Sequence, residues 1–224
     1  MTTFIKISRS PSDDILIDGN ALDVRQWVTK PDSQTGDALS ASQAFEHLRA
    51  STSLRHLVVG VIGPRNANEA QLAAAERIGA LLGRLGITLI CGGKNGVMNA
   101  VSRGCDGSGG LMVGILPGNS PADANEFVGI PLPTGLGEAR NMVIAKSARV
   151  LIAIGGSYGT LSEVAYGLHF SKPVIGVEGA ADIPGVIHVG DAEEAVAVAL
   201  DALLFSAAYP GPSGGCNIAY RGRA

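Results

Sequence analysis

Three short glycine-rich runs hold the residues of this chain whose types and spacing could do chemistry. They are GPRN at 63–66, GGKNG at 92–96 and GGSYGTLSE at 155–163. Each run follows an aliphatic stretch typical of a buried parallel strand and precedes a helical pattern. Glycine permits a tight turn and close ligand approach, and the free N–H groups of a helix start bind anions. The three runs together predict a pocket for a phosphorylated, nucleotide-like small molecule.

Polar side chains within these runs extend the predicted site. Thr160 lies in the expected first turn of its helix and can offer a hydroxyl to a phosphate. Glu163 follows Gly159 by one helical turn, so its carboxyl group reaches the same mouth. Lys94 either contacts an anion or faces solvent, and Asn95 either lines the pocket or caps a helix.

The glycine spacing disfavours the commonest nucleotide-binding motifs. Gly92 and Lys94 are too close together for a Walker A sequence. No GxGxxG is followed by an acidic residue about 20 positions later, as a dinucleotide site requires. Ordinary ATP or NAD binding is therefore not expected.

Strand and helix patterns alternate regularly from residue 57 onward, which predicts an α/β fold with a parallel sheet flanked by helices. Such sheets bind ligands beyond the carboxyl ends of their strands, where the strand order reverses. Strands are expected at 57–62, 87–91, 111–116, 127–133, 150–154, 173–177 and 187–189. Helices are expected at 66–85, 96–104, 137–148, 158–171 and 191–205, with Asn66 and Asp191 as candidate caps.

The first 55 residues have a different pattern. Alternation at 4–8 and 15–18 predicts a β-hairpin, and 40–50 predicts a short helix capped by Ser40 or Ser42. We therefore expect 1–55 to form a small β-rich extension packed on a main domain at 56–208. The segment 209–224 is rich in Gly, Pro and Ser and is expected to be a flexible tail.

Composition restricts the class of partner. The net charge is −3, aromatic residues make up only 4%, and no basic stripe occurs, so nucleic acid is not an expected partner. No signal-peptide pattern and no run of about 18 apolar residues is present, so we expect no membrane span and a cytoplasmic location. Three scattered cysteines and four histidines without ligand-like spacing predict neither a disulfide nor a protein-bound metal.

Several of these runs resemble family motifs, in one collinear order over about residues 56–205. CGGKNGVM at 91–98 resembles the GGGxxGxM motif of the LOG family, and GSYGTLSE at 156–163 resembles its PGGxGTxxE motif. TGLGEARN at 134–141 and GVIGP at 60–64 are more similar to molybdenum-cofactor carrier proteins, a sister branch. The resemblance implies a Rossmann-like, doubly wound sheet and a homodimer or higher homo-oligomer. The superfamily is also related to DprA/Smf proteins. Its older label is lysine decarboxylase, but the sequence shows no lysine in a context typical of pyridoxal-phosphate binding, so we do not expect that activity.

The two branches imply two different functions. The carrier branch implies a bound molybdenum cofactor, an anionic pterin phosphate bearing molybdenum, carried without turnover. The LOG branch implies hydrolysis of a nucleoside 5′-monophosphate to free base and ribose 5-phosphate, with no cofactor required. Its matching catalytic pair is Glu163, which would stabilise an oxocarbenium-like transition state, and Arg140, which would assist the departing base. Asn141 stands where the enzymes have a lysine, which favours the carrier branch.

The glycine turns and the resemblance together give one set of candidate ligand-binding residues, with no metal ligand among them. The set is Gly63, Pro64, Gly92, Gly93, Lys94, Asn95, Gly96, Arg140, Asn141, Gly156, Ser157, Tyr158, Gly159, Thr160 and Glu163.

Overall fold

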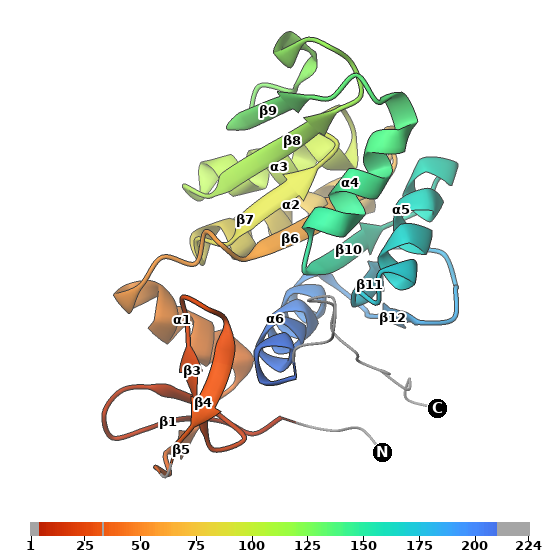
Figure 1. Cartoon of the computed structure of the whole chain (residues 1–224). Coiled ribbons are helices and arrows are strands. Elements are labelled where there is room, and N and C mark those ends of the chain that lie inside the picture. Colours follow the sequence, from red (N-terminus) through yellow and green to blue (C-terminus); the bar gives the residue numbers. More distant parts are fainter. Residues whose placement is uncertain (1–4, 33, 210–224) are drawn as a thin grey trace.

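The computed structural model describes residues 5–32 and 34–209. It is an α/β fold with a seven-stranded parallel sheet flanked by helices and a five-stranded antiparallel sheet at the N-terminal end (Figure 1). The predicted fold class is therefore confirmed. The segment predicted as a flexible tail, 209–224, lies outside the described residues except for its first position.

The parallel sheet has the order β12-β11-β10-β6-β7-β8-β9, and every neighbouring pair is parallel. All seven predicted strands are present. The edge strand β9 begins three residues later than expected. Asn125 accepts from the Phe127 N–H at its side-chain oxygen and from the Val128 N–H at its carbonyl oxygen, which holds this backbone in a turn. The strands are β6 (Val58–Ile62), β7 (Thr88–Cys91), β8 (Leu111–Leu116), β9 (Ile130–Pro133), β10 (Val150–Ile154), β11 (Val174–Val177) and β12 (Val186–His188).

Helices cover both faces of this sheet, which divides its core into two apolar clusters. One face carries α2 (Glu69–Arg84), α3 (Val97–Gly107) and α6 (Ala192–Ala208). The other carries α4 (Arg140–Ser147) and α5 (Tyr158–His169) (Figure 1). All five predicted helices of the main domain are thus confirmed as elements.

The start of α2 corrects one predicted cap. The helix begins at Glu69, and its cap is Asn68 rather than Asn66. Asn68 Oδ1 accepts from the Gln71 N–H at 2.9 Å, and Gln71 Oε1 accepts in return from the Asn68 N–H at 3.2 Å. This reciprocal pair is a capping box, which satisfies two otherwise free N–H groups. The cap predicted at Asp191 is confirmed, since its side chain accepts from Glu194 N at 2.8 Å.

The helix predicted at 137–148 is shorter than expected. Its first turn is the 3₁₀ helix η2 (Gly137–Ala139), and α4 runs only from Arg140 to Ser147. Gly137 has φ +56°, outside the right-handed helical region, so the α-helix cannot start there. The break places Arg140 at the first position of α4, at the edge of the crevice described below.

The N-terminal sheet is β4-β3-β2-β1-β5, and all of its pairs are antiparallel. The predicted hairpin is confirmed as the β1–β2 pair, and the predicted helix is α1 with Ser40 as its cap. The three further strands were not predicted. The elements are β1 (Ile7–Arg9), β2 (Ile15–Ile17), β3 (Asn20–Asp23), β4 (Val28–Pro31), β5 (Asp37–Ala38) and α1 (Ala41–Ser51).

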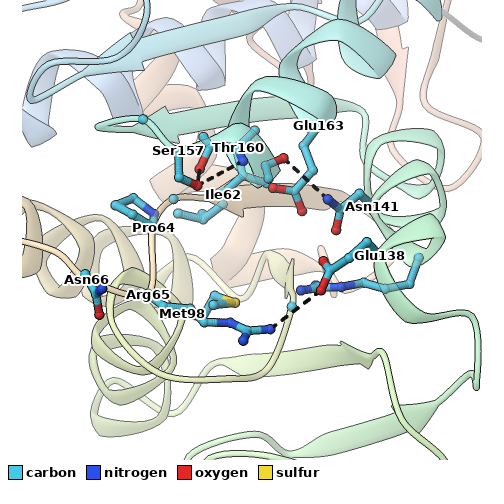
Figure 2. Close-up of a pocket in the computed structure, with 16 residues that line it drawn as sticks. Ile62, Pro64, Arg65, Asn66, Met98, Glu138, Asn141, Ser157, Thr160 and Glu163 are labelled. Atoms are coloured by element: carbon cyan, nitrogen blue, oxygen red, sulfur yellow. Dashed lines mark hydrogen bonds and ion pairs between the residues drawn. The ribbon is translucent and has the colours of Figure 1, made fainter.

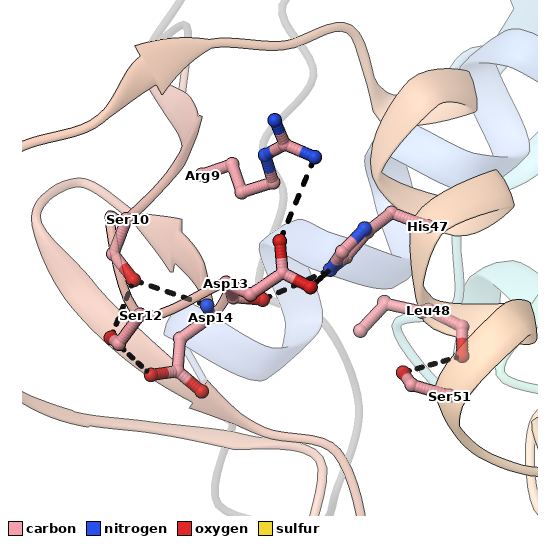
Figure 3. Close-up of polar contacts among 8 residues, drawn as sticks. All are labelled: Arg9, Ser10, Ser12, Asp13, Asp14, His47, Leu48 and Ser51. Atoms are coloured by element: carbon pink, nitrogen blue, oxygen red, sulfur yellow. Dashed lines mark hydrogen bonds and ion pairs between the residues drawn. The ribbon is translucent and has the colours of Figure 1, made fainter.

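The β1–β2 turn is tied to α1 by polar contacts (Figure 3). Asp13 has φ +74°, and Ser10 Oγ accepts from the Asp14 N–H across the turn at 3.1 Å. The ring of His47, on α1, lies 2.9 Å from the Asp13 carbonyl oxygen. Arg9, at the end of β1, lies 3.6 Å from the Asp13 carboxylate. These contacts fix the hairpin against the helix.

Helix α6 packs against both parts of the molecule. It contacts β10 and β11 of the parallel sheet on one side and α1 and β4 on the other. Trp27, which is 2% exposed, donates from its indole N–H to the Leu203 carbonyl oxygen at 2.8 Å. Residues of the N-terminal sheet, α1 and α6 therefore belong to one continuous apolar cluster. None of the described helices is long and apolar enough to cross a membrane.

Candidate functional site

The strand order reverses between β6 and β10. From β6 the chain proceeds outward through β7, β8 and β9, whereas β10, β11 and β12 extend in the opposite direction. The connections from these two central strands therefore leave to opposite faces of the sheet and open a crevice beyond their carboxyl ends. The glycine-rich runs after β6 and β10 both lie at this crevice.

A pocket of about 430 Å³ occupies the crevice (Figure 2). Its size falls within the range of small-molecule sites. Its walls come from the turns after β6, β7 and β10, from the starts of α4 and α5, and from α3. The lining residues are Val61, Ile62, Gly63, Pro64, Arg65, Asn66, Gly92, Met98, Glu138, Arg140, Asn141, Gly156, Ser157, Gly159, Thr160 and Glu163.

The start of α5 supplies the part of the pocket best suited to an anion. Ser157 caps the helix, with its Oγ accepting from the Thr160 N–H at 3.3 Å and lying 3.0 Å from Thr160 Oγ1. A Cβ at Gly156 would meet no atom within 4 Å, so the turn is open on that side. The positive end of the helix dipole and two hydroxyl groups thus face one open turn, a combination that suits a phosphate.

Two other glycines bring the walls of the pocket close together. A Cβ at Gly63 would lie 2.6 Å from Val97 Cγ1 and 2.8 Å from the Ile154 carbonyl oxygen. Gly96 has φ +70°, and a Cβ there would overlap the backbone at Arg65. The Val97 N–H donates to the Pro64 carbonyl oxygen at 3.1 Å. The first two glycine-rich runs therefore pack directly on each other.

Part of the predicted set lies outside the pocket. Lys94 donates from Nζ to the Asp123 carbonyl oxygen at 2.9 Å, and Gly93 O accepts from Asn125 N at 2.8 Å, so this turn is bound to the loop before β9. Tyr158 is 93% exposed. The predicted residues that line the pocket are Gly63, Pro64, Gly92, Arg140, Asn141, Gly156, Ser157, Gly159, Thr160 and Glu163, whereas Gly93, Lys94, Asn95, Gly96 and Tyr158 do not.

Arg140 is the buried cation of the site. Its side chain is 4% exposed, and its Nε and Nη1 atoms are buried without a hydrogen-bond partner. A Cβ at Gly92 would overlap the guanidinium group, so glycine at that position makes room for it. An unpaired buried guanidinium costs free energy and requires an explanation, which an anionic or carbonyl oxygen of a ligand would supply.

Glu163 is the buried acid of the site. Its side chain is 6% exposed, and burial raises its pKa from an ordinary value near 4.5 to about 8. The positive charge of Arg140 opposes this rise of the pKa, and the negative charge of Glu138 adds to it. At neutral pH the Glu163 carboxyl group is therefore mostly protonated, so it can donate as well as accept a hydrogen bond.

Asn141 is the second residue of α4, and its side chain reaches α5. Its Nδ2 donates to Ser162 Oγ at 2.8 Å, and Ser162 Oγ donates to the Gly159 carbonyl oxygen at 2.7 Å. Its Oδ1 is buried without a partner. Asn141 thus joins the starts of the two helices and leaves one polar atom unused.

Sequence reasoning did not select several pocket residues. Arg65 Nη2 and Glu138 Oε1 lie 3.9 Å apart, and both side chains are exposed (Figure 2). Both residues belong to runs that the sequence singled out, Arg65 to GPRN at 63–66 and Glu138 to TGLGEARN at 134–141, and this membership was the available signal. The apolar lining from Val61, Ile62 and Met98 carries no sequence signal that separates it from ordinary core.

Two cysteines of the described chain are buried free thiols. Burial raises the pKa of Cys91 to about 11 and that of Cys105 to about 12, so both stay protonated at neutral pH. Neither lines the pocket. No group of three or more His, Cys, Asp or Glu side chains within the described ranges is arranged to hold a metal ion.

With this geometry in place, comparison with known proteins assigns the family. Residues 56–201 match the model of the SLOG cluster4 family. The chain belongs to the SLOG cluster4 family. Among curated relatives, an uncharacterized protein of Archaeoglobus fulgidus is 38% identical over 143 residues, which cover 64% of this chain and 94% of that protein. A probable cytokinin riboside 5′-monophosphate phosphoribohydrolase of Oryza sativa subsp. japonica is 37% identical over 94 residues, which cover 41% of this chain and 38% of that protein.

Solved structures of molybdenum-cofactor proteins resemble this SLOG cluster4 protein. The molybdenum cofactor binding protein of Rippkaea orientalis is 35% identical with a TM-score of 0.62, over 66% of this chain and 97% of that chain. The molybdenum cofactor carrier protein of Chlamydomonas reinhardtii is 33% identical with a TM-score of 0.61, over 66% and 98%. DprA of Streptococcus pneumoniae, at 16% identity and a TM-score of 0.52 over 64% of this chain and 62% of that one, shares the fold alone.

These matches confirm the predicted superfamily. The family model begins at residue 56, and two thirds of this chain covers the two cofactor proteins almost completely. The N-terminal sheet and α1 lie before the family match. The phosphoribohydrolase of rice is matched over well under half of its length.

Proposed function

We propose that this SLOG cluster4 protein binds the molybdenum cofactor, or a similar pterin phosphate, and carries it without turnover. The observation that carries the proposal is the pocket itself, which combines an open helix start for a phosphate with a buried, unpaired guanidinium and a mostly protonated acid. The names of the two cofactor-binding relatives support it.

The start of α5 would hold the phosphate of the ligand. Gly156, Ser157 and Thr160 line one side of the pocket, and Arg140 lies in its buried part. A phosphate at the helix start and an acceptor oxygen at Arg140 would satisfy both groups without a proton transfer. The arrangement therefore suits binding and release of an intact anion.

The state of Glu163 argues for binding rather than catalysis. A carboxylate can stabilise an oxocarbenium-like transition state only when it is ionised. Burial holds the pKa of Glu163 at about 8, so at neutral pH most molecules carry a neutral carboxyl group there. An anionic ligand nearby would favour the neutral form further. Asn141, in place of a lysine, also leaves this wall without a second cation.

A second candidate function is hydrolysis of a nucleoside 5′-monophosphate to free base and ribose 5-phosphate. The specific observation in its favour is that Arg140 and Glu163 line the same pocket, as the LOG resemblance requires of a catalytic pair. The relative from rice carries that activity in its name. For this alternative, only those protein molecules in which the Glu163 carboxyl group is ionised would be active.

Transfer of the cofactor tests the carrier proposal. The protein is loaded with molybdenum cofactor released from a molybdoenzyme and is then mixed with a cofactor-free molybdoenzyme whose activity is followed. We expect molybdenum to co-elute with the wild-type protein and to restore that activity. Arg140→Ala should retain about one tenth of the loading or less, because it removes a charged partner of the ligand. Failure of the wild-type protein to retain molybdenum would contradict the proposal.

Release of free base from AMP and other nucleoside monophosphates tests the alternative. If the protein is a carrier, the wild type should release no free base. Release that is abolished by Glu163→Gln or Arg140→Ala would establish the hydrolase and displace the carrier proposal.

We also propose that the protein assembles as a homodimer or higher homo-oligomer. Large apolar side chains are exposed around the starts of α4 and α5, with Leu136 at 50%, Met142 at 42% and Tyr158 at 93%. Exposed apolar groups of this kind are typical of interfaces. Sedimentation at several concentrations should give a mass of at least two chains, and a monomer at every concentration would refute the assembly.

A further inference from the structure

Buried polar atoms without partners are concentrated at one place in the described part of the chain. They are Nε and Nη1 of Arg140 and Oδ1 of Asn141, and both residues line the pocket. Almost all buried polar atoms in native proteins have a partner, so adjacent exceptions require a common explanation. The unused donors of Arg140 require an acceptor, whereas the unused oxygen of Asn141 requires a donor.

The hydrogen bonds around Asn141 fix which end of its amide is unused. Ser162 Oγ has a single proton, and the Gly159 carbonyl oxygen, which can only accept, lies 2.7 Å away. Ser162 Oγ can therefore only accept from Asn141, so the amide atom 2.8 Å from it is Nδ2. Nδ2 is also 3.4 Å from the Gly159 carbonyl oxygen, which strengthens this orientation.

The amide oxygen consequently faces away from α5. Figure 2 shows Asn141 bonded toward α5, with its oxygen on the side of Glu138. Asn141 is only 3% exposed, so bulk water does not satisfy this oxygen. The start of α5 therefore holds the amide in an orientation that leaves one acceptor aimed into the pocket.

We infer that Asn141 determines ligand specificity by accepting, at Oδ1, a hydrogen bond from an N–H or O–H group of the ligand whose neighbouring oxygen accepts from Arg140. This inference rests on the proposed function, because it concerns the same pocket. It narrows the ligand to molecules that present a donor beside an acceptor oxygen. The lactam edge of a pterin or guanine ring, with N–H beside C=O, has this chemistry, and so does a sugar with adjacent hydroxyl groups.

Binding of GMP and two analogues by calorimetry tests the inference. In 1-methyl-GMP the ring N–H is replaced by a methyl group, and 2′,3′-dideoxy-GMP lacks the sugar hydroxyls. We expect Asn141→Leu, which is similar in size but has no polar group, to bind GMP about tenfold more weakly than the wild type. The analogue that lacks the relevant donor should bind wild type and variant equally weakly, and its identity tells whether the ring or the sugar supplies the donor.

Three results would overturn the inference. They are equal GMP binding by Asn141→Leu and wild type, the same loss for GMP and for both analogues, and no GMP binding by the wild type. Asn119→Leu, an equivalent change in an exposed loop outside the pocket, is the control and should bind GMP as the wild type does. Cofactor transfer by the wild-type protein would still stand in each case, so this failure is distinct from failure of the carrier proposal.

The Tm of Asn141→Leu and of the wild type, measured without ligand, shows whether the variant folds normally. Asn141→Leu removes an unsatisfied buried acceptor but also loses the hydrogen bond to Ser162, and these two effects on stability oppose each other, so its Tm should stay close to that of the wild type. A large fall in Tm would indicate a structural role and contradict the inference. Ser162→Ala provides a second variant, because it releases the amide without removing it. It should weaken GMP binding by less than Asn141→Leu does.

Discussion

Glu163 is a buried carboxyl group that lines a pocket which we expect to receive an anion. Burial raises its pKa from about 4.5 to about 8, and Arg140 only partly opposes that rise. The unfolded chain exposes the same group to water, where it ionises near pH 4.5. Folding therefore takes up a proton at this residue over the intervening pH range.

The first prediction follows from this proton uptake. The contribution of Glu163 to the free energy of unfolding is fully present below about pH 4.5 and is lost as pH rises toward 8. The loss should approach about 1.4 kcal/mol per pH unit within that window. Denaturant unfolding at a series of pH values should show this slope as the difference between wild type and Glu163→Gln. Glu69→Gln, which removes an exposed carboxylate at the start of α2, should not reproduce it.

Ligand affinity should follow the same group. An anion bound beside Glu163 is repelled once the carboxyl group ionises, so affinity for the phosphorylated ligand should fall as pH rises through about 8. Binding to Glu163→Gln should lack this fall. An unchanged pH profile in the variant would mean that another group controls the binding.

The contact between Gly92 and Arg140 gives a further prediction at this scale. Any Cβ at position 92 overlaps the guanidinium, so Gly92→Ala must displace it. We expect Gly92→Ala to weaken ligand binding about as much as Arg140→Ala, roughly tenfold or more, because both remove the same charge from the pocket. Wild-type affinity in Gly92→Ala would show that Arg140 does not contact the ligand.

At the scale of elements, glycines let α2 and α3 pack with their backbones nearly in contact. A Cβ at Gly104 of α3 would overlap the Glu76 carbonyl oxygen of α2 and lie 3.0 Å from Ala80 N. A Cβ at Gly79 of α2 would overlap the Val101 carbonyl oxygen. This close packing positions the start of α3, and with it Gly96 and the turn at Gly92, against the pocket.

Gly104→Ala should therefore destabilise the protein. The backbones must separate to admit the methyl group, at a cost of about 2 kcal/mol, which lowers Tm by roughly 4–8 °C in a chain of this size. Gly107 is the matched control on the same helix, since a Cβ there meets nothing within 4 Å. Gly107→Ala should leave Tm unchanged or slightly raised, because alanine favours the helix. Equal effects of the two substitutions would contradict this account.

At the scale of the whole molecule, α6 joins two sheets into one apolar core. It is buried on several sides because the N-terminal sheet and α1 cover what the parallel sheet does not. Trp27 anchors this contact through its hydrogen bond to Leu203 and through a tilted ring contact with Phe45, with ring centroids 5.8 Å apart. A continuous core of this kind favours one cooperative unfolding unit.

The single tryptophan of the chain makes this testable. Trp27 fluorescence reports the N-terminal sheet, and far-UV circular dichroism reports mainly the larger α/β part. We expect both signals to change at the same denaturant concentration. Trp27→Phe should lower the free energy of unfolding measured by circular dichroism by about 1–2 kcal/mol, because the indole hydrogen bond to the Leu203 carbonyl oxygen is lost and only the Ser206 hydroxyl still donates to that oxygen. A fluorescence change at clearly lower denaturant would indicate that the N-terminal part unfolds separately.

The sequence by itself determined the α/β class, the parallel strands and most of the pocket. A short, continuous aliphatic run such as 150–154, followed at once by a glycine turn, favours a buried strand over a helix, and a turn after such a strand must lie at the carboxyl edge of the sheet. Ser157, Thr160 and Glu163 could be assigned to the pocket because their positions relative to one turn are local. Beyond the predicted β1–β2 hairpin, the strands β3, β4 and β5 of the N-terminal sheet could not be predicted, because such short strands are defined by pairing with each other and by contact with the rest of the fold.

Only the tertiary structure decided how the polar groups of the site behave. Gly93 and Gly92 are neighbours in one motif, yet only Gly92 lines the pocket, since its partner Arg140 arrives from 48 positions further along the chain. The protonation of Glu163 and the unused oxygen of Asn141 depend on burial and on partners from other elements. A sequence pattern specifies residue type and local geometry, whereas solvation and hydrogen-bond partners are set by segments that meet only in the fold.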